Sequence, residues 1–320
     1  MDSTVAAPRG TTGTRAWIRD NGVYAAIVLL IAYNLAFTEN FASFANLSTQ
    51  LVQVAPVLIV ALGMALVIGT EGVDLSVGSV MAIAAAILPL YLGYGIVPAI
   101  GLALVAGALC GLLNGTLVAV VGIQPIVATL ALLVGGRGLA LVFANGQLKD
   151  IRNADLLDLG SGKLLGIPLV VWIAAVLAAL VWLLVRYTTF GRQLVAVGGN
   201  RSASALAGLP VRRVLMATYV ASGVLAAIAG IVATARLTAS DPSAIGNLYE
   251  LSAITAVVVG GTPLSGGRVR ILGTVAGALL MQLITATLIK HDLPDSTAQI
   301  VQAVIIVVAV YLQRAKAGGR

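Results

Sequence analysis

The sequence predicts an all-α polytopic membrane protein, with about ten transmembrane helices and a cytoplasmic loop between the sixth and the seventh. Of its 320 residues, 59% are hydrophobic and 10% are charged, and the mean hydropathy is +1.04. Soluble domains carry about 25% charged residues, so this composition excludes an ordinary soluble domain. The apolar residues also form successive runs, and roughly 17 to 25 of them are needed to cross a hydrocarbon core about 30 Å thick.

The ten runs are interpreted as a single transmembrane domain, residues 23–312, between cytoplasmic tails at 1–22 and 313–320. A cleaved signal peptide is the alternative for the first run, but Trp17 and the nearby arginines favour a retained span. The weakest run is the eighth, which is short and broken by glycine. The predicted spans are 23–37, 51–68, 77–92, 97–121, 126–143, 167–185, 215–235, 251–261, 271–289 and 300–311.

The placement of basic residues agrees with this count, because Lys and Arg are enriched in cytoplasmic segments. Ten spans with both termini inside put the tails, the loop 186–214, Arg268 and Arg270 on the cytoplasmic side. A re-entrant eighth run would move Arg268 outside, against this rule. Topology thus explains the net charge of +7 better than a nucleic-acid partner does. The basic residues predicted outside are fewer: Lys149, Arg152, Lys163, Arg236 and Lys290.

The loop 186–214 is the longest polar segment between apolar runs. It contains arginines but no acid, which is typical of a cytoplasmic loop. Its residues 195–207 are small and weakly amphipathic, which predicts one short helix under the membrane. A solvated connector is the alternative, but the Gly, Ala and Ser pattern favours a docking surface. The arginines are Arg186, Arg192, Arg201, Arg212 and Arg213.

The segment 70–78 places Glu71 and Asp74 between two apolar runs, where ionisable groups are costly unless they reach water or a partner. In the structural interpretation, Asp74 caps the third span by accepting from the amides near Ser76. In the functional interpretation, this broken helix end also lines the solute path. The two interpretations are compatible.

Three further polar residues lie within predicted spans. Arg137 is expected to be buried about 18 Å along its helix from Pro125, with Glu71 or Asp74 as its partner. Asn114 and Gln282 are either polar contacts between helices or hydrogen-bonding groups on the solute path.

The sequence predicts no catalytic site, bound cofactor or metal site in this chain. It contains no nucleotide-binding P-loop motif, a single cysteine, Cys110, and a single histidine, His291. The glycine-rich segment 260–268 is therefore interpreted as a tight turn. An internal repeat is a further hypothesis, because Asp-Leu-Ser at 74–76 and Glu-Leu-Ser at 250–252 each precede a Val-Ala-Gly-Ala-Leu tract.

Four motifs carry a resemblance to a known family. They are GVDLSVGSVMAI from Gly72, IQPIVATLALLVGGRGLA from Ile123, GGNRSASALAGLPVRRV from Gly198 and ELSAITAVVVGGTPLSGGR from Glu250. Together they resemble the membrane permease subunits of ABC importers for monosaccharides, of the ribose and galactofuranose type, over residues 54–311. The sequence departs from the usual pattern at Val73, where isoleucine is common, and at Glu71, where a small residue is common.

The resemblance implies a permease domain in a bacterial inner membrane that is not itself an enzyme. It implies three kinds of protein partner: an ATPase subunit that consumes the ATP, a second permease chain that is either identical or a paralogue, and a periplasmic or lipid-anchored sugar-binding protein. An ion-coupled secondary sugar transporter is the alternative. The resemblance assigns ATPase coupling to Gly191, Ala196, Gly198, Gly199, Asn200, Ala203, Ala207 and Gly208.

Overall fold

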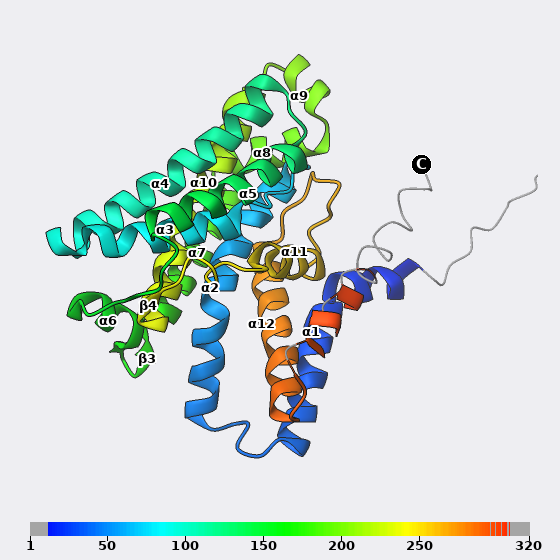
Figure 1. Cartoon of the computed structure of the whole chain (residues 1–320). Coiled ribbons are helices and arrows are strands. Elements are labelled where there is room, and N and C mark those ends of the chain that lie inside the picture. Colours follow the sequence, from blue (N-terminus) through cyan, green and yellow to red (C-terminus); the bar gives the residue numbers. More distant parts are fainter. Residues whose placement is uncertain (1–11, 295, 298, 302, 306, 308–320) are drawn as a thin grey trace, which may run out of the picture.

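The computed structural model describes the backbone of residues 12–294, 296–297, 299–301, 303–305 and 307, and side chains from Gly22 onward. Most of this part is helical, as predicted (Figure 1). The α-helices are α1 (Thr12–Phe37), α2 (Phe44–Gly69), α3 (Val77–Tyr91), α4 (Ile96–Thr116), α5 (Pro125–Phe143), α6 (Ala154–Ser161), α7 (Leu169–Tyr187), α8 (Thr189–Gly199), α9 (Arg201–Leu206), α10 (Val211–Leu237), α11 (Tyr249–Val259) and α12 (Ile271–Lys290). A 3₁₀ turn, η1 (Leu92–Tyr94), follows α3, and a π-helical turn, η2 (Leu117–Val121), follows α4.

Short strands tie two connections together at one end of the bundle. β1 (Lys149–Asp150) pairs antiparallel with β4 (Ala239–Ser240), and β2 (Lys163–Leu164) pairs antiparallel with β3 (Ile167–Pro168). The hairpin formed by β2 and β3 shortens the predicted sixth span at its start, because residues 167–168 pair as a strand before α7 begins. Helix α6 lies in the same region, at the left of Figure 1 near β3.

The core is built around two long helices, α2 and α10. Both are mostly buried, and α10 packs against α4, α2 and α3. Small residues allow this close approach: a Cβ on Gly111 of α4 would overlap the backbone of Tyr219 in α10. Each of the two shorter helices packs against the long helix of the other half of the chain: α3 packs on α10, and α11 packs on α2. This reciprocal packing agrees with the hypothesis of an internal repeat, which stays a prediction.

Seven helical segments in the described part of the chain are long and apolar enough to cross a membrane. They correspond to the predicted spans two to seven and nine. The apolar part of α1 and helix α11 are shorter. The end of the predicted tenth span and the C-terminal tail, residues 308–320, lie outside the described residues, as does most of the N-terminal tail at 1–11.

Helix α11 connects the two ends of the bundle although it is only 11 residues long, or about 16 Å. Before it, β4 pairs with β1 at one end. After it, the amide of Gly267 donates to the carbonyl of Gly69, next to α8 at the other end, 3.1 Å away. The segments on either side of α11 therefore cover the distance between the two ends that the short helix alone does not cover.

Helix α1 packs along α12, as a retained first span would. Val23 is buried against Ala276 and Leu280. Further along, the buried Asn34 side chain donates to the Thr287 hydroxyl, 2.7 Å away. A buried hydrogen bond of this kind fixes the register of two apolar helices.

The loop 186–214 is helical, but the prediction of one helix over 195–207 is wrong. The chain forms two helices, α8 and α9, which are separated by Asn200. The backbone of Asn200 is extended, and the side-chain oxygen of Asn200 accepts a hydrogen bond from the amide of Ala203, 2.9 Å away. Asn200 therefore caps the second helix and prevents the first from continuing.

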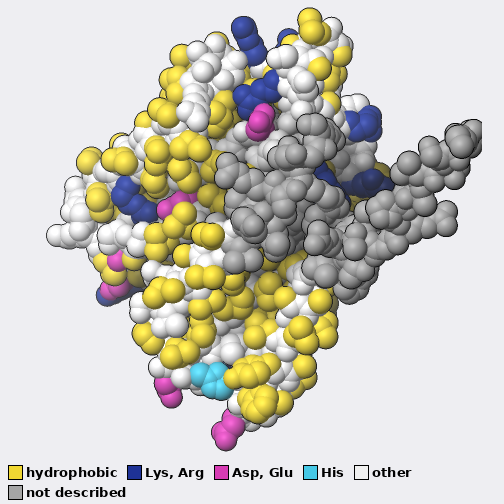
Figure 2. Space-filling model, turned by 90° about the vertical axis from the view of Figure 1, so that its right-hand side faces the viewer, with side chains coloured by type: hydrophobic (Ala, Val, Ile, Leu, Met, Phe, Trp, Pro, Cys, Tyr) yellow, Lys and Arg dark blue, Asp and Glu magenta, His cyan; other side chains and the backbone are white. Residues whose placement is uncertain are grey.

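The surface separates charge from apolar area. Figure 2 shows hydrophobic side chains over much of the lower half of one face, with Lys and Arg side chains mainly in the upper half. The upper end is where Figure 1 places α8 and α9. Basic residues at one end and apolar area below them are typical of a membrane protein, in which Lys and Arg are enriched on one side of the bilayer.

Candidate functional site

The break between α2 and α3 contains a buried carboxylate. Asp74 is 1% exposed. Its Oδ1 accepts from the amide and the hydroxyl of Ser76, at 3.1 and 2.6 Å, and its Oδ2 accepts from the hydroxyl of Ser222 in α10, at 2.8 Å. The Ser76 amide thus donates to Asp74 as predicted, but Ser76 is the residue before α3 and the helix has no side-chain cap, so Asp74 does not cap the helix itself. Both carboxylate oxygens are engaged, so Asp74 ties the break to α10.

Two more polar groups surround this carboxylate. Asn114 of α4 donates from Nδ2 to the Ser76 hydroxyl, 2.8 Å away, which brings three predicted site residues together. Its Oδ1 and the hydroxyl of Tyr219 are buried, and neither has a hydrogen-bond partner among the described residues. Buried polar atoms without partners are uncommon and costly. In this cluster, both oxygens of Asp74 therefore accept hydrogen bonds, while Asn114 Oδ1 and the Tyr219 hydroxyl remain able to form further ones.

Arg137 lies elsewhere, and its predicted pairing with Glu71 or Asp74 is wrong. Its Nη1 donates to the carbonyls of Pro242 and Ile245, both at 2.7 Å, in the segment between β4 and α11. The carboxylates whose field it feels are Glu250 and Asp241. Residues 238–248 leave the helical pattern and expose backbone carbonyls, which is why a cation on α5 binds there.

Glu250 occupies the second break in the same way that Asp74 occupies the first, but with fewer partners. It lies in the first turn of α11, and its Oε2 is buried with no hydrogen-bond partner in the described part of the chain. Gly78 of α3 lies against it, since a Cβ built there would sit 2.6 Å from Oε2 and would overlap the Gly246 carbonyl. The start of α3 and the start of α11 therefore meet.

Gln282 belongs to a third polar group, apart from the others. Its Nε2 donates to the side-chain oxygens of Gln50 and Gln53 in α2, at 2.7 and 2.8 Å. These contacts agree with the interpretation as a polar contact between helices. The five predicted path residues thus fall into three separate groups.

The structure divides the eight predicted coupling residues into two sets. Gly191 and Gly198 are buried against the transmembrane domain. The other six are exposed on the outer side of α8 and α9: Ala196, Gly199, Asn200, Ala203, Ala207 and Gly208. Leu206, which lies among them, is 91% exposed. Its side chain is therefore available for contact with a partner.

The buried set lies on a seam of close backbone contacts. A Cβ on Gly198 would overlap the Gly69 carbonyl at the end of α2, and it would come within 2.8 Å of the Gly267 amide. Arg201 adds a hydrogen bond from Nη2 to the carbonyl of Thr70, 2.9 Å away. The coupling helices are therefore attached to the residues that begin the break at 70–76 (Figure 1).

Several functional candidates were missed by sequence reasoning. Ser222 lies 148 residues from Asp74 and is one of many small residues in α10, so no local pattern singles it out. Leu206 was detectable, because it is the large apolar residue in a segment of Gly, Ala and Ser. In the sequence, Glu250 supports the repeat hypothesis. It could also have been predicted as a site residue, because placing an acidic side chain next to a membrane-spanning run costs free energy.

Comparison with known proteins adds a family. The model described as "Branched-chain amino acid transport system / permease component" matches residues 46–310. The ribose import permease protein of Escherichia coli K12 is 38% identical over 309 residues, which cover 95% of this chain and 96% of that protein. No solved structure gave a significant match.

Two further relatives are named as permeases for other sugars. The galactofuranose transporter permease protein of Escherichia coli K12 is 44% identical over 261 residues, 81% of this chain and 76% of its own length. The fructose import permease protein of Bifidobacterium longum is 39% identical over 289 residues, 88% and 81% of the two chains.

Proposed function

Because the chain belongs to the family of branched-chain amino acid transport system permease components, we propose that it is the membrane-spanning subunit of an ABC importer for a monosaccharide. The relatives named for ribose, galactofuranose and fructose support a small sugar as the solute. Such a subunit is a transport protein and not an enzyme. ATP is used by a separate partner, and this chain binds no cofactor of its own.

The proposed topology has ten spans in a bacterial inner membrane, with both termini in the cytoplasm. The seven long apolar helices, the packing of α1 on α12 and the course of α11 between the two ends support nine of them. We assign the end with α8 and α9 to the cytoplasm, because it contains most of the arginines. The partners are an ATPase subunit, a second permease chain, either identical or a paralogue, and an extracytoplasmic sugar-binding protein.

The observation that supports this function best is the attachment of the exposed helices α8 and α9 to the break at 70–76. Movement of these helices by an ATPase would act directly on Gly69 and Thr70, through the contacts of Gly198 and Arg201. Those residues continue into the Asp74 network, which holds α10 and α4. A docking surface and a buried break in the membrane are thus mechanically continuous.

The five path residues receive different roles in this proposal. Asp74, Ser76 and Asn114 hold the shape of the break, because they bond to one another. Arg137 is half-buried and is close enough to Glu250 to feel its charge, and Oε2 of Glu250 has no hydrogen-bond partner in the described part of the chain. Of the five residues, we therefore propose Arg137 as the one that contacts the solute. Gln282 joins α12 to α2.

Two adjacent glycines provide the test of coupling. In Gly198→Ala the new methyl group overlaps the Gly69 carbonyl, so α8 must move away from α2. Gly199→Ala is the matched control, because its nearest neighbour, the Gly267 Cα, lies 4.0 Å from the added carbon. We expect the sugar taken up per ATP hydrolysed to fall by roughly tenfold in Gly198→Ala and to stay near the wild-type ratio in Gly199→Ala. This range follows from an overpacking cost of about 1–3 kcal/mol.

The measurement is made in proteoliposomes that contain the permease, its ATPase and the sugar-binding protein, with hydrolysis and uptake followed together. Equal ratios in the two variants would contradict the assigned coupling role of Gly198. Uptake by the permease alone, driven by an ion gradient and insensitive to ATP depletion, would instead support the secondary-transporter alternative.

A further inference from the structure

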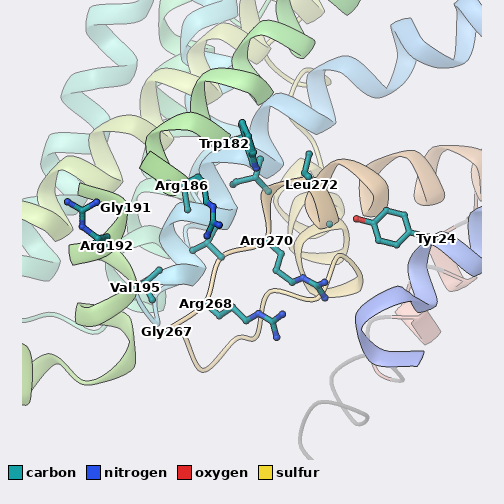
Figure 3. A pocket seen from close by; sticks show the side chains of 14 residues that line it. Tyr24, Trp182, Arg186, Gly191, Arg192, Val195, Gly267, Arg268, Arg270 and Leu272 are labelled. Carbon is teal, nitrogen blue, oxygen red and sulfur yellow. The ribbon is translucent and has the colours of Figure 1, made fainter. Parts of the chain in front are cut away.

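A basic groove lies beside the coupling helices, where α7 turns into α8. It has a volume of about 570 Å³ and is bounded by α7, α8, the start of α12 and Tyr24 of α1. Figure 3 shows Arg186 near Trp182 on α7, with Arg192 apart from it on α8. The Arg270 side chain runs away from α7 toward Gly261 at the end of α11, Arg268 lies below it, and the Tyr24 hydroxyl is turned toward α12. Neither the transport path nor the exposed face of α8 and α9 uses this groove.

The charge of the groove has one sign. Four of its lining residues are arginines, Arg186, Arg192, Arg268 and Arg270, and none of the lining residues that the structure describes is acidic. Arginine binds phosphate oxygens through two parallel N–H donors, with geometry that lysine lacks. A phosphate group is therefore the ligand chemistry that this lining fits.

The groove also has an apolar side at the depth of a membrane interface. Trp182 lies about 7 Å along α7 from its last residue, taking 1.5 Å per residue. Leu272 at the start of α12 is 61% exposed, and Tyr24 is 42% exposed. Trp and Tyr concentrate at the level of lipid headgroups, while an open leucine next to them suits an acyl chain. The groove thus presents cations and apolar area side by side.

We propose that this groove binds an anionic glycerophospholipid of the cytoplasmic leaflet, with the phosphate among the arginines and one acyl chain along Trp182 and Leu272. Basic pockets between transmembrane helices on the cytoplasmic side are known to suit anionic headgroups. The bound lipid bridges α7–α8 to residues 267–273, and Gly267 of that segment contacts the seam of Gly69 and Gly198. Binding therefore steadies the attachment of the coupling helices.

A second basic groove on the same end of the molecule provides a matched comparison. It has a volume of about 630 Å³ and its lining includes Arg201, Arg212 and Arg213, but no aromatic residue. It offers a similar charge without the interfacial Trp and Tyr. Arg212→Gln/Arg213→Gln therefore removes the same charge as Arg186→Gln/Arg192→Gln while leaving the proposed lipid site complete.

The experiment uses the full chain, purified in detergent with the subunits that accompany it. Dioleoyl phosphatidylglycerol or dioleoyl phosphatidylcholine is added, and bound lipid is counted by native mass spectrometry. We expect the wild type to prefer phosphatidylglycerol, and Arg186→Gln/Arg192→Gln to bind it roughly 10- to 30-fold more weakly, since each basic residue contributes about 1 kcal/mol. Arg212→Gln/Arg213→Gln should bind it like the wild type. Arg186→Lys/Arg192→Lys should retain part of the preference, because the charge remains.

Four results would overturn the proposal. One is equal binding of both lipids by the wild type, and another is an equal loss in the two glutamine double variants. The third is displacement of phosphatidylglycerol by millimolar inorganic phosphate, which would assign the groove to a free anion. A loss of the ATPase subunit with lipid binding unchanged would likewise assign these arginines to protein docking.

Discussion

Asp74 and Glu250 stand at two breaks in the bundle, and their surroundings differ. Each precedes a Leu-Ser pair, Asp74 just before the short helix α3 and Glu250 in the first turn of the short helix α11. Asp74 accepts three hydrogen bonds, from Ser76 and Ser222. Glu250 has a buried oxygen without a partner in the described part of the chain, and its cationic neighbour Arg137 donates instead to backbone carbonyls.

The difference teaches that the same sequence feature can serve two purposes. An acid whose oxygens are fully bonded locks a break in one conformation, because any movement would leave buried groups unpaired. An acid with an open oxygen next to a cation retains capacity for a new hydrogen bond. The first break therefore acts as an anchor for α4 and α10, and the second is the one able to accept a solute or a rearranged neighbour.

Removing the anchor should have the largest effect. Asp74→Ala leaves the Ser76 amide and the Ser222 hydroxyl without their acceptor, so we expect a loss of about 2–5 kcal/mol in the free energy of unfolding. Ser222→Ala removes one of the three bonds and should cost about 1 kcal/mol. Thermal unfolding of the purified variants in detergent, followed by size-exclusion chromatography, measures both. Equal midpoints for Asp74→Ala and the wild type would remove the distinction between the two breaks.

The second break should respond less, and mainly through the cation. Arg137→Gln loses two hydrogen bonds to carbonyls, which we expect to cost about 1–3 kcal/mol. Glu250→Gln keeps the shape and changes an oxygen that has no hydrogen-bond partner in the described part of the chain, so its cost should stay below about 1 kcal/mol. The same unfolding assay ranks the two. A larger loss for Glu250→Gln than for Arg137→Gln would mean that Glu250 has a structural partner after all.

The sequence was sufficient for the features that depend on local composition. The helical membrane fold, the family and its function are confirmed, because hydropathy and motifs persist along the chain. The hydrogen bond from the Ser76 amide to Asp74 was also predictable, since the two residues are two positions apart. Pairings across the bundle were not predictable: Ser222 and the carbonyl partners of Arg137 lie more than one hundred residues from the groups they bind.

The break in the coupling loop shows a second limit. The composition of 195–207 predicts helix, and both α8 and α9 are helical. What divides them is the conformation of one residue, Asn200, whose side chain competes with the helical backbone for the Ala203 amide. Asparagine tolerates either role, so its sequence position alone does not decide between one helix and two.

The smallest effect that separates the breaks is a dependence on pH, and it belongs to Asp241 in the loop before α11. The Ser243 hydroxyl donates to Asp241 Oδ1 and is the main cause that holds the pKa of this carboxyl below its ordinary value. A depressed pKa stabilises the folded state above the pKa of the unfolded chain, near 3.9, and this contribution disappears as the pH falls through the folded pKa.

Ser243→Ala should therefore lower the unfolding midpoint at pH 6 by a small amount, and this difference should shrink as the pH falls and the carboxyl becomes protonated in both proteins. The effect stays small because Asp241 is partly open to water, which screens its interactions. Midpoints measured from pH 2 to pH 6 test the sign. A difference of the same size at every pH would show that Ser243 acts through packing alone, and the second break would then have no titrating group outside the membrane.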